Sequence, residues 1–201
     1  MKWIRKYKLL IVAGILLALY FTGYSVDRSP RVKVNAETGI LDLTGVRLDQ
    51  DIVGLEGQWE FFWNRYVLPG ETEVAGDRAY IQVPGSWNKF SGNPEQSGYG
   101  TATYRLQILI PQETRLAFFV PRVHTAYEMF VNGELVAGAG TVGKNLEDSD
   151  PRYMPQIVLF ESRAGVNEIL INVSNFHHRS GGMLESIQLG SEENILRLQT
   201  G

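Results

Sequence analysis

The sequence predicts an all-β fold, a sandwich or jelly roll of two antiparallel sheets that follows a hydrophobic N-terminal helix. Apolar and polar residues alternate in several short stretches of the 201-residue chain, a period typical of half-buried antiparallel strands. Prolines and an Asn-Gly pair separate these stretches, and no central stretch keeps a helical period. About eight such strands in succession favour a two-sheet sandwich.

Residues 1–24 have the composition of a signal peptide or a signal anchor. Four basic residues precede an uncharged run of 16 residues, Leu9–Tyr24: Lys2, Arg5, Lys6 and Lys8. A basic flank before an apolar run is typical of export signals, although this run is shorter than the roughly 20 residues of a full membrane span. Because no small-x-small cleavage motif follows, an uncleaved anchor is favoured over a cleaved signal. The basic flank stays in the cytoplasm, so we expect a domain at the cell membrane, on its extracytoplasmic side.

The rest of the chain divides into three parts. Residues 25–38 are polar and contain a proline, as expected for a tether. Residues 39–190 hold the strand pattern and form the predicted sandwich. In residues 191–201, Ser191 precedes two glutamates, which predicts the capped start of a helix. The chain ends about two turns later, so we expect a truncated linker or helix there.

Three stretches carry the clearest strand pattern, residues 58–63, 103–110 and 167–175. Asn132-Gly133 lies between two further apolar stretches and predicts a tight hairpin, because both residues tolerate positive φ. The side chains expected in the core include Trp59, Phe61, Tyr104, Leu106, Phe118, Phe130 and Ile171.

Charge and composition exclude several functions. Without the four basic N-terminal residues, 15 basic residues stand against 22 acidic ones, a net charge of −7. An acidic domain without a basic run is a poor partner for nucleic acid or anionic lipid. The chain has no cysteine, which excludes disulfides, thiolate metal sites and cysteine nucleophiles.

Several sequence blocks occur in an order that resembles a known family. LEGQWEFFW, VPGSWN, GYGTATYRLQILIP and AYEMFVNGELVAGAGTVG follow one another and are similar to blocks of galactose-binding-like jelly rolls. These include the sugar-binding domain that precedes the barrel of family 2 glycoside hydrolases. With SNFHHRSGGMLESIQLGSEENI added, residues 39–198 resemble more closely the outside-facing domain of bacterial seven-transmembrane receptors with diverse intracellular signalling modules.

This resemblance implies a galactose-binding-like jelly roll that senses a ligand outside the cell. It also implies seven membrane helices downstream and a cytoplasmic output such as a histidine kinase, a nucleotide cyclase or a diguanylate cyclase. The chain ends where those helices would begin, so we expect the transmembrane and signalling domains to be missing from it.

The stretch SNFHHRSGG offers the first candidate site. His177, His178 and Arg179 lie between the strand at 167–175 and a final strand expected within 183–190, hence at one end of the sandwich. Arginine presents a planar fork for a carboxylate or phosphate, so these side chains are candidate ligands for a carbohydrate or an anion. The alternative is structural: the histidines cap backbone groups and Gly181 and Gly182 allow a tight turn.

Glu185 shares strand parity with Met183, Ile187 and Leu189. If those apolar residues face the core, Glu185 faces it too and needs a partner. Arg179, His178 or Arg105 would provide one, as a structural ion pair or as part of a ligand site.

Aromatic residues give a second candidate site. Trp87 and Tyr99 flank the polar loop NKFSGNPEQSG, and sugars stack their apolar faces on exposed rings. In the related sugar-binding domains the tryptophan of VPGSWN packs structurally, so a role in the core is the alternative for Trp87.

Catalysis, metals and cofactors are not indicated. The strand carboxylates have no spacing that would pair them for glycoside hydrolysis, and no nucleophile elbow or phosphate loop occurs. We therefore expect a non-enzymatic sensory domain that binds a small ligand, such as a carbohydrate. The alternatives are a carbohydrate-binding accessory module of an exported glycoside hydrolase, or a domain that binds another protein through an open sheet edge.

Overall fold

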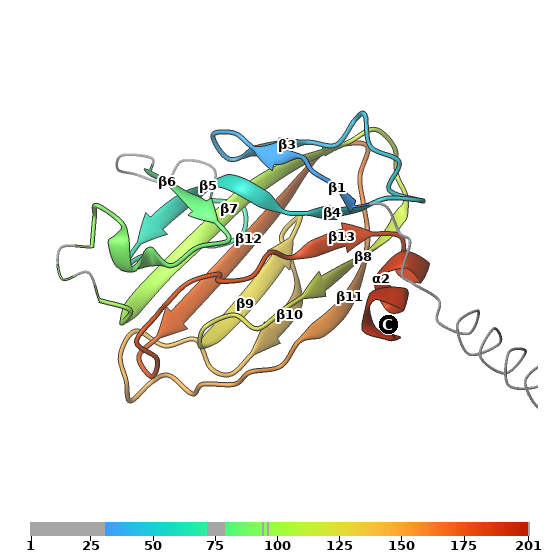
Figure 1. The fold of residues 1–201 in the computed structure, drawn as a ribbon. Coiled ribbons are helices and arrows are strands. Elements are labelled where there is room, and N and C mark those ends of the chain that lie inside the picture. Colours follow the sequence, from blue (N-terminus) through green and yellow to red (C-terminus); the bar gives the residue numbers. More distant parts are fainter. Residues whose placement is uncertain (1–30, 72–78, 94, 96, 201) are drawn as a thin grey trace, which may run out of the picture. The chain divides into compact units, whose positions relative to one another are not determined.

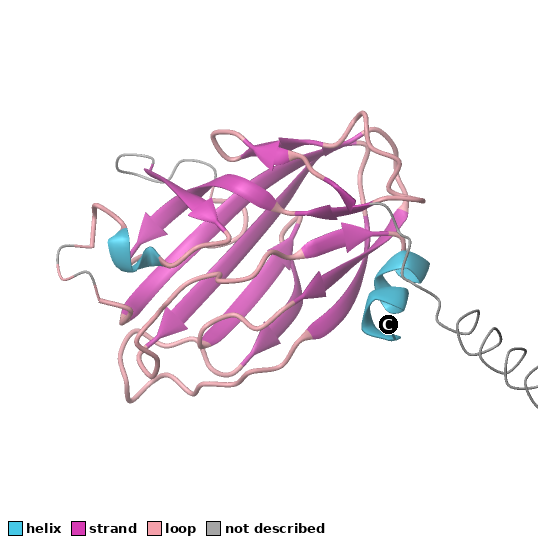
Figure 2. Ribbon diagram, viewed as in Figure 1, coloured by secondary structure: helices cyan, strands magenta, loops and turns pink. Residues whose placement is uncertain are grey.

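The computed structural model describes residues 31–71, 79–93, 95 and 97–200, and it is a two-sheet β-sandwich (Figures 1 and 2). The predicted all-β sandwich is therefore confirmed. The predicted hydrophobic segment 1–24 lies outside the described residues. Within the described residues, the structure has no helix long and apolar enough to cross a membrane.

The elements in chain order are β1 Arg31–Val32, β2 Asn35–Ala36, β3 Ile40–Asp42, β4 Ile52–Gly54, β5 Glu56–Trp63, β6 Ala79–Val83, the 3-10 helix η1 Trp87–Lys89, β7 Gly100–Ile110, β8 Arg115–Val120, β9 Ala126–Val131, β10 Glu134–Ala139, β11 Gln156–Glu161, β12 Gly165–Asn175, β13 Gln188–Gly190 and α2 Glu192–Thr200.

The two sheets differ in size. The five-stranded sheet has the order β1-β4-β13-β8-β11, and the eight-stranded sheet has β10-β9-β12-β7-β5-β2, with β3 on β7 and β6 on β5. The long pairings, such as β12 with β7, are antiparallel, as predicted. The short N-terminal strands β1, β2 and β3 pair in parallel with β4, β5 and β7, so both sheets are mixed.

The N-terminal strands correct one domain boundary. Residues 25–38 were predicted to be a tether, but Arg31 pairs with Ile52 and Asn35 with Glu56. The folded domain therefore includes residues that composition alone assigned to a linker.

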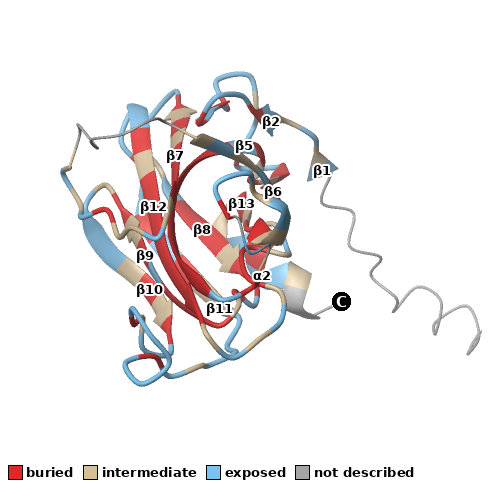
Figure 3. Cartoon of the chain, turned by 90° about the vertical axis from the view of Figure 1, so that its left-hand side faces the viewer, coloured by how far each residue is buried: buried red, intermediate tan, exposed pale blue. Residues whose placement is uncertain are grey.

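The core lies between the sheets, where the strand faces are buried (Figure 3). The predicted core residues Trp59, Phe61, Tyr104, Leu106, Phe118 and Ile171 are buried together there. Phe130 is the exception: it packs with Phe62, Val67 and Leu170 in a separate cluster. Phe62, Phe130 and Leu170 have the opposite strand parity to the core residues, which puts them on the other face of the eight-stranded sheet.

Local turn and cap predictions are confirmed. Asn132 and Gly133 have φ of 51° and 91° between β9 and β10, as a two-residue hairpin requires. At α2, the Ser191 hydroxyl accepts a hydrogen bond from the Asn194 N–H at 3.3 Å, and Glu192 and Glu193 lie in the first turn.

Candidate functional site

Residues 176–182 form a loop that leaves the end of β12, and Asn175 fixes its course. The buried Asn175 Nδ2 donates to the Gly98 carbonyl at 2.7 Å and to the His178 carbonyl at 2.6 Å. Its Oδ1 accepts from the His178 N–H at 2.9 Å. One asparagine thereby satisfies backbone groups on both sides of the turn, which an apolar residue would leave unpaired.

The same loop rests on the tryptophan of VPGSWN. Trp87 Nε1 donates to the Gly98 carbonyl at 3.0 Å, and Asn88 Nδ2 donates to the Arg179 carbonyl at 2.9 Å. Gly181 approaches the indole so closely that a Cβ there would lie 2.2 Å from Trp87 Cε2. We call Trp87, Asn88, Gly98, Asn175 and Gly181 the loop clasp.

The loop clasp decides between the two roles considered for Trp87. Trp87 was a candidate sugar contact, but it is completely buried and has no surface to offer a ligand, so that prediction is wrong. Tyr99 is 53% exposed and keeps the candidate role. His177 and Arg179 have exposed side chains on the loop, and the His177 Nε2 lies 3.2 Å from the Ser149 hydroxyl.

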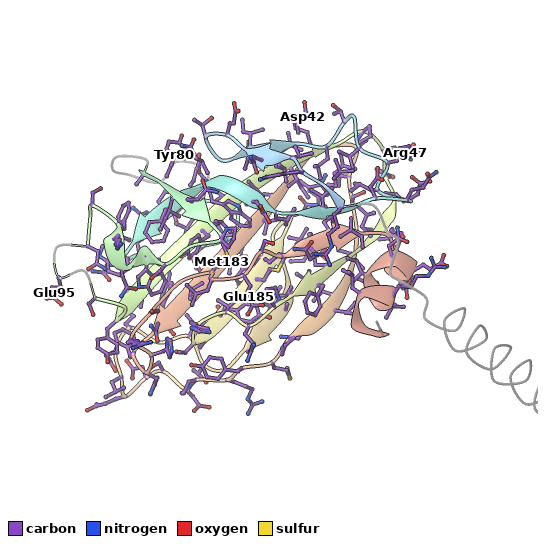
Figure 4. All side chains as sticks on the ribbon, in the orientation of Figure 1. Asp42, Arg47, Tyr80, Glu95, Met183 and Glu185 are labelled. Carbon is purple, nitrogen blue, oxygen red and sulfur yellow. The ribbon has the colours of Figure 1, made fainter. Side chains whose placement is uncertain are left out.

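Glu185 corrects a second prediction. Strand parity placed it in the core, yet its side chain is 54% exposed and its Oε1 lies 3.9 Å from the Nε of Arg122, itself 60% exposed. The last strand is only Gln188–Gly190, so residues 183–187 do not alternate as a strand does. Figure 4 shows Glu185 on this irregular segment, two residues after the buried Met183.

His178 contacts His124, a residue that the sequence prediction had not connected with it, and His124 in turn contacts Tyr153. Its ring and that of His124 are 4.6 Å apart at 79°, and the His124 and Tyr153 rings are 5.4 Å apart at 84°. We call His124, Tyr153 and His178 the histidine cluster. The 176–182 loop positions the histidine cluster, because Gly182 of this loop pairs with His124 in an isolated β-bridge.

The rim of the histidine cluster carries charge. Arg122 and Glu185 both act electrostatically on His124. Burial lowers the pKa of His124 most, and the neighbouring charges of His178 and Arg122 lower it further, while the Ser180 carbonyl and Glu185 oppose this. Because the pKa of His124 lies below the ordinary value of about 6.5, its ring is neutral at pH 7.

The cluster combines an exposed aromatic face with polar groups of both kinds. Tyr153 is 47% exposed, a position from which a ring can stack. An Arg guanidinium supplies donors and a Glu carboxylate supplies acceptors. Among the described residues, no group of three or more His, Cys, Asp or Glu side chains is arranged to hold a metal.

A hollow in the surface lies away from the histidine cluster. A volume of about 750 Å³ is lined by residues of β10, β11 and their neighbours, among them Glu134, Leu159 and Arg163. None of its lining residues belongs to the histidine cluster or the loop clasp.

The solved structures that resemble this chain are parts of larger glycosidases. A GH2 β-galacturonidase from Eisenbergiella tayi is 18% identical with a TM-score of 0.50, and the match covers 70% of this chain and 24% of that chain. A β-glucuronidase from an uncultured Clostridium sp. is 14% identical with a TM-score of 0.52, covering 71% and 29%. A Ruminococcus gnavus β-glucuronidase is 13% identical with a TM-score of 0.51, covering 69% and 28%.

These likenesses establish the fold. The chain spans about a quarter of the length of these enzymes. No protein-family model and no curated protein matches it.

Proposed function

We propose that this chain is a non-enzymatic sensory domain that binds a small hydroxylated ligand, such as a carbohydrate, at the histidine cluster. The N-terminal apolar segment holds it at a bacterial membrane, with the sandwich on the extracytoplasmic side. Occupancy is passed on through the segment that follows Ser191, as in the receptors that the sequence blocks resemble.

The observation that carries the proposal is the grouping of Tyr153, Arg122 and Glu185 around His124. A pyranose has an apolar face that stacks on an aromatic ring, and vicinal hydroxyls that both donate and accept hydrogen bonds. Arg122 and Glu185 are more than half exposed and only 3.9 Å apart, a loose pair that two hydroxyls can bridge. Such an exposed pair stabilises the fold by at most about 1 kcal/mol, so separating it reduces the free energy of ligand binding only slightly.

The fold supports the ligand class. Domains of this shape occur in enzymes named β-glucuronidase and β-galacturonidase. Glucuronate and galacturonate therefore belong in the set of probes, beside neutral hexoses. The runner-up function is a carbohydrate-binding accessory module of an exported glycoside hydrolase, which the same likeness favours. It would require a catalytic domain on the same polypeptide.

The test is a thermal-shift screen of the purified chain against neutral sugars, the two uronates, amino acids and inorganic phosphate. A ligand that binds only the folded state stabilises it by about 2.7 kcal/mol at 100 times its Kd and so raises the melting temperature. We expect a sugar or uronate to produce such a shift.

Variants locate the site. Tyr153→Ala and Arg122→Ala should abolish the shift while both proteins remain folded. Tyr80→Ala, at a tyrosine that is 37% exposed on β6, is the matched control and should keep it. Loss of the shift in Tyr99→Ala alone would move the site to the loop at 90–99, and no response to any probe would refute the proposal.

A further inference from the structure

We propose that His124 and His178 form a proton-responsive latch, which loosens the 176–182 loop when the surroundings become mildly acidic. The latch regulates the site assigned under the proposed function. Its consequence for ligand affinity therefore depends on that function, whereas the latch itself is measured without a ligand.

The two histidine rings contact each other directly. His124 precedes β9 and His178 lies in the loop, yet their centroids are 4.6 Å apart in a T-shaped arrangement. A T-shaped aromatic pair is attractive when both rings are neutral. Two imidazolium ions at that separation repel each other, so protonation turns a contact that holds the loop into one that opposes it.

Hydrogen bonds inside the loop also change with protonation. The Nδ1 of His178 lies 3.1 Å from the Ser180 backbone nitrogen and 2.9 Å from the Ser180 carbonyl oxygen. An unprotonated Nδ1 accepts from the N–H, whereas a protonated Nδ1 can only donate to the carbonyl. The Ser180 carbonyl also faces His124, so both rings meet the same backbone group and protonation changes which of its bonds is made.

Groups of both charges surround His124. The charges of His178 and Arg122 lower its pKa and that of Glu185 raises it, and the ring of Tyr153 lies 5.4 Å away at 84°. Its Nδ1 is buried and has no hydrogen-bond partner among the described residues. Burial of the ring is the main cause of the lowered pKa, because a charged imidazolium there loses the hydration that it has in water.

The direction of the pH effect follows from linkage. Because the folded chain holds a proton on His124 more weakly than the unfolded chain does, unfolding is accompanied by proton uptake. The contribution of His124 to stability is complete above the ordinary histidine pKa of about 6.5. It declines as the pH falls from there to the lower pKa of the folded state.

The experiment is an NMR titration of the histidine side chains of the full chain, with melting temperatures measured at about pH 7.5 and about pH 5.5. We expect His124 to titrate below its ordinary value, and its midpoint to rise in His178→Gln. The Ser180 amide resonance should shift over the same pH range, because the Ser180 nitrogen lies 3.1 Å from the His178 Nδ1. His177→Gln is the matched control, because His177 lies in the same loop but contacts Ser149.

The melting temperatures give the second reading. On going from the higher to the lower pH, the melting temperature should decrease more in the wild-type chain and in His177→Gln than in His124→Gln. An unchanged His124 midpoint in His178→Gln would refute the latch. An equal pH loss in His124→Gln and the wild type would also refute it. Neither result depends on finding a ligand, so the proposed function stands or falls separately.

Discussion

Replacing Gly181 by alanine tests whether the loop clasp holds the end of the sandwich. The new Cβ would lie 2.2 Å and 2.3 Å from Trp87 Cε2 and Nε1, and 2.4 Å from the Gly98 carbonyl oxygen. Trp87 cannot rotate away, since it is completely buried and packs against Trp63 at 5.4 Å and Tyr104 at 6.5 Å between ring centroids. Overpacking of a filled core costs about 1–3 kcal/mol, and contacts this short put Gly181→Ala near the upper value.

For a domain of this size, each kcal/mol lowers the melting temperature by about 2–4 °C. Gly181→Ala should therefore melt about 6–12 °C below the wild type. Gly45→Ala is the control, because no heavy atom lies within 4 Å of the point where its Cβ would stand. That control should stay within about 0.5 kcal/mol of the wild type. Equal stability of the two variants in thermal and urea unfolding would show that the loop does not rest on Trp87 as described.

Three further variants test the charged residues. Glu60 accepts from Arg105 Nε at 2.6 Å, and the two side chains are only 11% and 6% exposed. Glu60→Ala should lower the free energy of unfolding in urea by about 3–5 kcal/mol, because it leaves the buried Arg105 without its carboxylate partner. Glu60→Leu combined with Arg105→Met should lower it less. A double variant as unstable as the single one would contradict this. Glu185→Ala should change the free energy of unfolding by less than about 0.5 kcal/mol because the carboxylate is exposed, and a loss above about 1 kcal/mol would favour the buried placement.

Predictions that depended on short-range patterns succeeded. The Asn132-Gly133 turn needs only residues that adopt positive φ at adjacent positions, and the cap at Ser191 needs only a hydroxyl before a helical turn. The alternation in residues 103–110 and 167–175 places one face in the core because successive side chains of a strand point to opposite sides.

The prediction for Glu185 failed because parity holds only within a strand. The ladder begins at Gln188, and the irregular backbone before it turns Glu185 outward. The prediction for Trp87 failed for another reason. A tryptophan beside a polar loop looks accessible in a sequence, but the loop from 176 to 182 folds over it.

The sequence did not predict the histidine cluster. His124 and His178 are 54 positions apart, and Tyr153 lies between them in the chain. The only signal was that the chain has just three histidines, which does not say that two of them touch.

The sequence by itself determined the fold class, the main strands, the hairpin and the start of the last helix. Each of these depends on neighbours within a few residues, where chain geometry and the need to bury apolar side chains leave few alternatives. The tertiary structure alone decided which polar groups meet, because His124, Tyr153 and His178 come from segments that no local rule connects. Their contact exists only once the loop after β12 has closed over Trp87 and brought Gly182 beside His124.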